Sequence, residues 1–314
     1  MSYNSTLGSS TNKRDSYGSG GLLLFLPPYR NMTKTTYTLC TLALLLAASC
    51  SAPQAKTTEK DTAVSAIAQS PKDLLRQAYQ LFKEGDDAAS IELANTVLEI
   101  GRETKNDTLV GRALTSLCRN AQRKLDTTRL AELSLELSNL AATSGNPQWL
   151  MYRAHMNAEM WRLIGNMDRA EDYYNESMRI SYETGAMGMY TIDHFNKSFV
   201  SIAKADFETA NQLITKYYAL RKKADSTAAE DAYGLIALAC LLEKQGNYTG
   251  AHDVATVTRR LFKEQNLFPE PPDEKPLIAV EDKVSEVLDS ATLAEIRIRS
   301  QTQSVSGLLA KYLE

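Results

Sequence analysis

The sequence has few of the residues that usually build catalytic or metal sites. Its 314 residues include only three histidines and four cysteines. They form no paired-cysteine motif and no His-Glu-X-X-His motif, and no glycine-rich phosphate loop is present. Cys118 and Cys240 fall at apolar positions far apart in the chain, which favours two small buried residues over a disulfide. We therefore expect no metal and no cofactor, and we expect that the protein is not an enzyme.

An excess of charge of one sign is also missing. The chain has 35 Lys and Arg residues against 38 Asp and Glu residues, for a net charge of −3. Nucleic-acid-binding proteins need a basic surface, so this balance gives no indication of a nucleic-acid partner. Apolar residues make up 43% of the chain, which is enough for a substantial core.

The N-terminal part has the pattern of a targeting segment. We expect residues 1–31 to be untranslated or disordered, with Met32 as the true start. From there Lys34 supplies a short basic region, and residues 42–48 form an apolar run too short to span a bilayer. The Ala47-Ala48-Ser49-Cys50 sequence that follows resembles a bacterial lipoprotein cleavage box.

This resemblance implies a signal peptide over residues 32–50 and lipidation of Cys50. The alternative is an ordinary secretory signal that is cleaved after a small residue. Ser51 resembles the residue that sorts lipoproteins to the outer membrane. We therefore expect a lipid-anchored protein of the cell envelope, on the outer membrane and facing the periplasm. Residues 51–70 lack apolar periodicity and are expected to form a flexible tether.

A helical pattern recurs five times between residues 71 and 265. Its clearest copy is Gly165-Asn166-Met167, followed by Ala170, Tyr174 and Ser177. Offsets of four and three lie on one helical face, and a small residue at the first position lets a second helix approach closely. The small residues of the five copies are at intervals of 41, 39, 40 and 41 residues: Ser90, Ala131, Ala170, Ala210 and Ala251. A second apolar helix pattern precedes each turn, so five helix pairs are expected.

These segments resemble the tetratricopeptide-repeat family, with a period near 40 residues and without the closing proline of that family. The resemblance implies an all-α solenoid of five to six stacked antiparallel helix pairs over residues 71–265. Residues 266–276 contain four prolines and are expected to form an extended connector. Residues 277–314 are expected to form capping helices, either as a divergent sixth pair or as one long helix.

In tetratricopeptide arrays the first helix of each pair lines a concave groove, and the resemblance implies the same here. Arginines and tyrosines on that face would suit a peptide carboxylate or acidic side chains. The alternative for each residue is an ordinary solvated position. The candidates are Arg112, Arg119, Tyr152, His155, Arg162, Asn196 and Tyr233.

The sequence therefore favours a membrane-anchored binding or scaffold protein that holds a peptide or partner protein of the envelope in its groove. One alternative is a periplasmic sensor that supplies the input of a signalling system. The other is an enzyme of helical-toroid type, which would need acidic residues gathered at one mouth. Fold alone does not decide among these functions.

Overall fold

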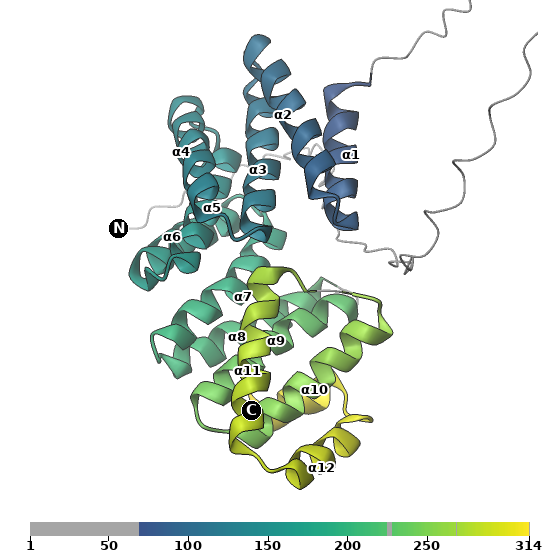
Figure 1. Ribbon diagram of the computed structural model, residues 1–314. Helices are drawn as coiled ribbons and strands as arrows, with labels where there is room; N and C mark the ends of the chain where they lie inside the picture. The colour runs from purple at the N-terminus through teal and green to yellow at the C-terminus, as the bar shows by residue number, and fades with distance from the viewer. Residues whose placement is uncertain (1–68, 225–227, 268, 314) are drawn as a thin grey trace, which may run out of the picture.

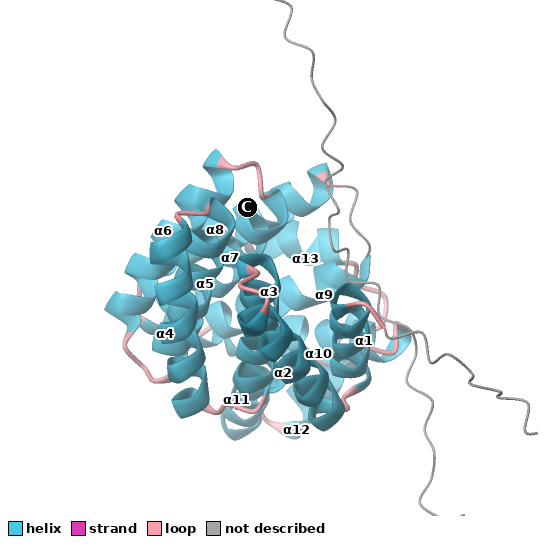
Figure 2. Cartoon of the chain, turned by 90° about the horizontal axis from the view of Figure 1, so that it is seen from above, coloured by secondary structure: helices cyan, strands magenta, loops and turns pink. Residues whose placement is uncertain are grey.

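The computed structural model describes residues 69–224, 228–267 and 269–313, and these residues form thirteen α-helices with no strand (Figure 2). No helix in these ranges is long and apolar enough to cross a membrane. Residues 1–31, the expected signal peptide at 32–50 with Cys50, and the tether up to residue 68 lie outside the described residues.

The first ten helices form five pairs, which confirms the all-α solenoid. Their bounds are α1 (Pro71–Glu84), α2 (Asp87–Glu103), α3 (Asp107–Arg123), α4 (Thr127–Ser144), α5 (Pro147–Leu163), α6 (Met167–Glu183), α7 (Met187–Ala203), α8 (Phe207–Lys223), α9 (Ala228–Lys244) and α10 (Tyr248–Glu264). Consecutive helices pack against each other along the whole series (Figure 1). The first helices of successive pairs also contact one another, so α1, α3, α5, α7 and α9 form an inner layer.

The second helix of every pair begins in the same way. A side chain at the N-cap accepts a hydrogen bond from the backbone N–H three residues on, which satisfies a donor that the helix itself leaves free. These caps follow one another at intervals of 40, 40, 40 and 41 residues: Asp86, Asp126, Asn166, Asp206 and Asn247. The repeat is therefore more regular than the spacing of small residues indicated.

Four of the five small contact residues are confirmed, and one is wrong. Ser90, Ala170, Ala210 and Ala251 are fully buried, four residues after their caps.

The exception is the copy in α4, where the expected Ala131 is exposed. Leu130 takes the buried position, and Leu135, expected on the same face as Ala131, is 64% exposed. Helix phase is set by the Asp126 cap, so the residue four positions after the cap is Leu130 and not Ala131.

The expected connector at residues 266–276 is also wrong, because helix α11 (Pro271–Val287) begins inside it. Pro271 and Pro272 occupy the first two helical positions, where the missing N–H has no intrahelical partner to lose. Pro276 lies inside the helix at the cost of one backbone bond. Burial of Leu277 and Val280, and packing of α11 against α9 and α10, offset that cost.

Beyond α11 the chain forms α12 (Ser290–Ser300) and α13 (Val305–Tyr312), not one long helix. The buried carboxylate of Asp253 in α10 holds both in place. It accepts hydrogen bonds from Ser300 at 2.7 Å, Lys311 at 3.0 Å and Tyr312 at 2.9 Å. Burial acts to raise the pKa of Asp253, but these donors outweigh it and the pKa is lowered.

Candidate functional site

The inner layer closes back on itself through helix α11. Besides α9 and α10, α11 contacts α3 of the second pair, and its N-terminal end points toward the first helices (Figure 1). Residues 270–273, here called the acidic turn, form this end: Glu270, Pro271, Pro272 and Asp273. The turn faces three arginines of α3 and α5, here called the arginine cluster: Arg119, Arg123 and Arg162.

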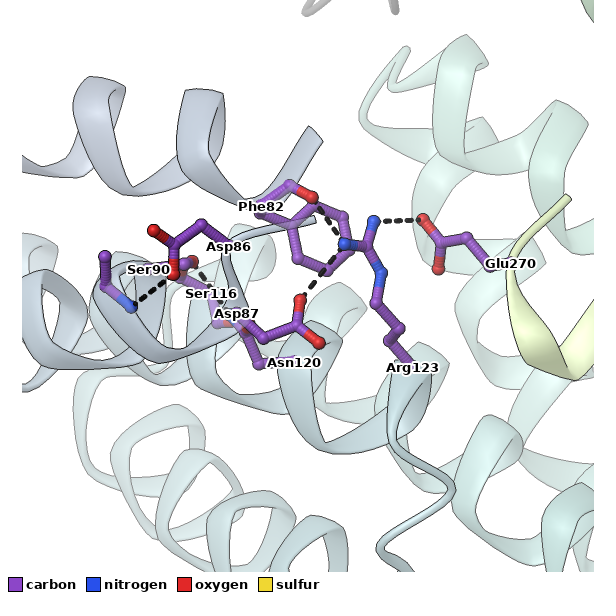
Figure 3. Close-up of polar contacts among 9 residues, drawn as sticks. Phe82, Asp86, Asp87, Ser90, Ser116, Asn120, Arg123 and Glu270 are labelled. Carbon is purple, nitrogen blue, oxygen red and sulfur yellow. Dashed lines mark hydrogen bonds and ion pairs between the residues drawn. The ribbon is translucent and has the colours of Figure 1, made fainter. Parts of the chain in front are cut away.

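Arg123 joins the turn to the first two pairs (Figure 3). Its Nη1 donates to the carbonyl of Phe82 and to Oδ1 of Asp87 at 3.1 Å, and its Nη2 donates to Oε1 of Glu270 at 3.3 Å. The guanidinium also lies 3.5 Å from the centre of the Phe82 ring, a close cation–π contact. The side chain is 16% exposed, so these contacts are made with little water around them.

Arg119 lies one helical turn earlier on the same face of α3. Its guanidinium is 6.0 Å from the centre of the Tyr79 ring, and within the described ranges it forms no hydrogen bond or ion pair. Burial raises the pKa of Glu270, while the charges of Arg123 and Arg119 act to lower it. Arg119 therefore acts on the carboxylate through its charge alone.

Asp273 faces the α5 side of the cluster. The residue as a whole is half-buried, and burial of its carboxyl group raises the pKa of that group to about 7. The charge of Arg162 opposes this rise, while Glu270 and Glu159 add to it. Tyr233 of α9 also belongs to these surroundings. Burial raises the pKa of its hydroxyl, and the charges of Asp273 and Glu270 raise it further.

A buried network of hydrogen bonds centred on Glu159 holds the side chain of Arg162 in position. Nη2 of Arg162 donates to Glu159 at 2.7 Å, and Gln122 donates to the same oxygen at 2.7 Å. The Tyr174 hydroxyl donates to the other oxygen of Glu159. Burial acts to raise the pKa of Glu159, but Arg162, His155 and Tyr174 together lower it. Nε of Arg162 is buried without a hydrogen-bond partner in the described structure.

His155 belongs to the support of this site and does not line a groove. Its Nδ1 lies 2.7 Å from Oδ1 of Asp193, and Ser177 donates to Oδ2 at 2.6 Å. Burial acts to lower the pKa of His155, but the charge and hydrogen bond of Asp193 outweigh it and the pKa is raised. Ser177 is fully buried and bonds Asp193 instead of the imidazole, so these three side chains lack the order of a nucleophile and its base.

The expected groove residues thus divide into two groups. Arg119, Arg162 and Tyr233 meet at the acidic turn. The remainder do not join them: Arg112 is exposed near the start of α3, Tyr152 stacks on Trp149 with ring centres 6.2 Å apart, and Asn196 is buried in α7.

Three residues of the site were missed from the sequence, namely Arg123, Glu270 and Asp273. Arg123 lies four residues after Arg119, and so on the same helical face, which was a usable signal. Glu270 and Asp273 gave no such signal, because the prolines around them indicated an extended connector.

Cys118 and Cys240 are buried and unpaired, as expected. Burial raises the pKa of each thiol to about 12, so neither is a reactive thiolate near neutral pH. Among the described residues, no group of three or more His, Cys, Asp or Glu side chains is arranged to hold a metal ion.

No protein-family model matches the chain, and no curated protein matches it. Among solved structures, the crystal structure of the apo form of RapI is similar. The two share 15% identity and a TM-score of 0.49, with 69% of this chain and 84% of that chain covered. Similarity at this level says nothing about function, and the helical-repeat fold is established by the helices themselves.

Proposed function

We propose that the protein is a binding scaffold, without chemistry of its own, whose arginine cluster takes an acidic segment of a partner protein or peptide. One observation carries the proposal: Arg123 binds Glu270 directly, and the charges of Arg119 and Arg162 act on the carboxylates of Glu270 and Asp273. The chain's own acidic turn therefore shows which chemistry this surface accepts. Arginine suits carboxylates because its planar fork offers several donors and keeps its charge when buried.

Two features favour a ligand site over a purely structural ion network. Arg119 has no ion pair in the described part of the chain, although it lies on the inner layer beside the turn. Nε of Arg162 is buried with a free donor. Buried donors are normally paired, and a donor without a partner calls for an explanation. An incoming carboxylate would supply the acceptor that Arg119 lacks.

The test is a crosslinking capture with the full-length protein in the cells that make it, read by mass spectrometry. We expect a partner whose crosslinked peptide is acidic. Its yield should fall at least tenfold with Arg119→Glu and stay unchanged with Arg112→Glu, a matched charge reversal on the same helix outside the cluster. Capture that survives Arg119→Glu would place the binding site elsewhere and overturn the proposal.

We further propose that Cys50 carries a lipid anchor, which would place the scaffold at the cell envelope, on the outer membrane and facing the periplasm. The Ala47-Ala48-Ser49-Cys50 sequence after a short apolar run supports this. Cys50→Ala should release the protein from the membrane fraction, because the acyl chains supply the membrane affinity. A variant that sediments with membranes as the parent does would refute the anchor.

A further inference from the structure

The acidic turn covers the arginine cluster in the protein as it stands. Glu270 is paired with Arg123, and Asp273 is near enough to Arg162 and Tyr233 for charge to act between them. Arg123 and Arg162 are largely shielded from water, with side-chain exposures of 16% and 8%. A partner's acidic segment could not reach these two guanidinium groups while the turn is in place.

The acidic turn lacks the side-chain cap that begins most of the described helices. Glu270 occupies the N-cap position, but its side chain makes no capping hydrogen bond because its carboxylate is directed to Arg123 (Figure 3). A missing cap typically costs about 1 kcal/mol. This end is held in the helix by backbone hydrogen bonds of 2.8 Å from Asp273 and Glu274 to the carbonyl of Glu270, and by burial of Pro272.

The rest of α11 is anchored independently of the cluster. Leu277, Val280 and Val284 are buried against the neighbouring helices. Arg259 of α10 binds Glu281 through two hydrogen bonds of 2.7 Å and Glu274 through one of 2.6 Å. The first turn could therefore leave the arginines while the body of the helix stays in place.

We propose that the acidic turn is a built-in competitor for the arginine cluster: it occupies the cluster in the free protein and is displaced when a partner's acidic segment binds. This inference rests on the proposed function, because it concerns the same cluster. It also specifies the partner's chemistry. A segment that replaces the turn presents two carboxylates three residues apart, as Glu270 and Asp273 do.

A competitor tethered next to its site occupies that site in most molecules. The apparent Kd of an added ligand then equals its intrinsic Kd divided by the fraction of molecules in which the site is open. The probe is a fluorescein-labelled peptide with the sequence of residues 269–277, added to the full-length protein and followed by fluorescence polarisation. We expect the double variant Glu270→Gln, Asp273→Asn to bind it at least tenfold more tightly than the parent does. The double variant Asp282→Asn, Glu286→Gln is the matched control, since both residues are exposed further along α11, and it should leave the affinity unchanged.

The outcomes separate the two proposals. If parent and double variant bind the peptide equally and Arg119→Glu abolishes binding, the cluster takes acidic segments but the turn is not a competitor. If no form binds the peptide, or Arg119→Glu has no effect on binding, the proposed function fails and the competitor with it. A peptide with Gln and Asn in place of its Glu and Asp at positions 270 and 273 should bind at least tenfold more weakly to the double variant.

Hydrogen exchange on the unaltered protein gives a second test that does not depend on the double variant folding. Saturating peptide should speed exchange of the backbone amides of residues 273–275 and 277, while those of residues 280–287 keep their protection. If the peptide binds and exchange at residues 273–275 and 277 does not change, displacement of the turn is overturned.

Discussion

Arg123 and Glu270 lie 147 residues apart in the chain, yet Nη2 of Arg123 is 3.3 Å from Oε1 of Glu270. Elsewhere the solenoid is built mainly from contacts between neighbouring helices in the chain, as stacked repeats require. This pair instead joins the second helix pair to the helix that follows the fifth. It defines where the inner layer closes and which residues are brought together there.

The buried Glu159 should contribute strongly to stability because it is the counter-charge of the buried Arg162. Removing it with Glu159→Ala leaves Arg162 buried without its counter-charge, which typically costs about 3–5 kcal/mol. We expect a loss of that size in urea denaturation. Glu132→Ala, which breaks an exposed ion pair with Arg129, should cost about 0–1 kcal/mol. Equal losses for the two variants would contradict the network seen around Arg162.

Stability should fall as pH rises toward neutrality because of Asp273. Its pKa is about 7 in the folded protein against 3.8 for an unperturbed carboxyl, so between about pH 4 and 7 the folded state holds the proton more tightly. The stabilisation is complete below the unfolded value and is lost as pH rises through the folded one.

The groups that face Asp273 are Arg162 and Glu159 from α5, Tyr233 from α9 and Glu270 from its own turn. His155 adds a trend of the same sign, since its pKa is also raised. The urea midpoint of the parent should therefore be lower at pH 8 than at pH 5, and Asp273→Asn should reduce the difference. An unchanged pH dependence in Asp273→Asn would show that another group is responsible.

The α7–α8 turn contains a non-glycine residue in the left-handed backbone region. Ala205 has φ of 58°, where a side chain costs roughly 1–2 kcal/mol. Ala205→Gly should therefore raise the free energy of unfolding by about 0.5–1 kcal/mol, after the extra chain entropy of glycine is subtracted. Ala219→Gly, at an exposed position inside α8, should lower it by about 1 kcal/mol. Chemical denaturation of both variants measures the contrast, and a loss in Ala205→Gly would count against a strained turn.

The phase of the repeats can be tested with two alanines. Ala170 is fully buried between helices, so Ala170→Leu should overpack the contact and cost about 1–3 kcal/mol. Ala131, which the sequence pattern placed at the same position of its copy, is exposed, and Ala131→Leu should be nearly neutral. Thermal unfolding distinguishes the two. A large loss of stability for Ala131→Leu would show that Ala131, and not Leu130, makes the helix contact in that copy.

The sequence by itself determined the helix pairs. Spacings of three and four residues, polar caps at regular intervals and small residues at helix contacts are local properties, and they are enough to specify hairpins of this length. The error at Ala131 arose because alanine and leucine both suit a helix, and only packing against the neighbouring helix decides which of the two is buried. Pro271 and Pro272 indicated a connector because a proline inside a helix is unfavourable. At the first two helical positions a proline is tolerated, but the sequence does not show that the helix begins there.

Only the tertiary structure decided the site. Arg119 and Arg162 could be named as inner-layer residues from helical phase, but Arg112 met the same criterion and lies apart. The curvature that brings α3, α5, α9 and α11 together is the sum of small rotations at each helix contact, and no single spacing in the sequence encodes that sum. The contact of Arg123 with Glu270, and the influence of the Arg162 charge on Asp273, follow from that curvature.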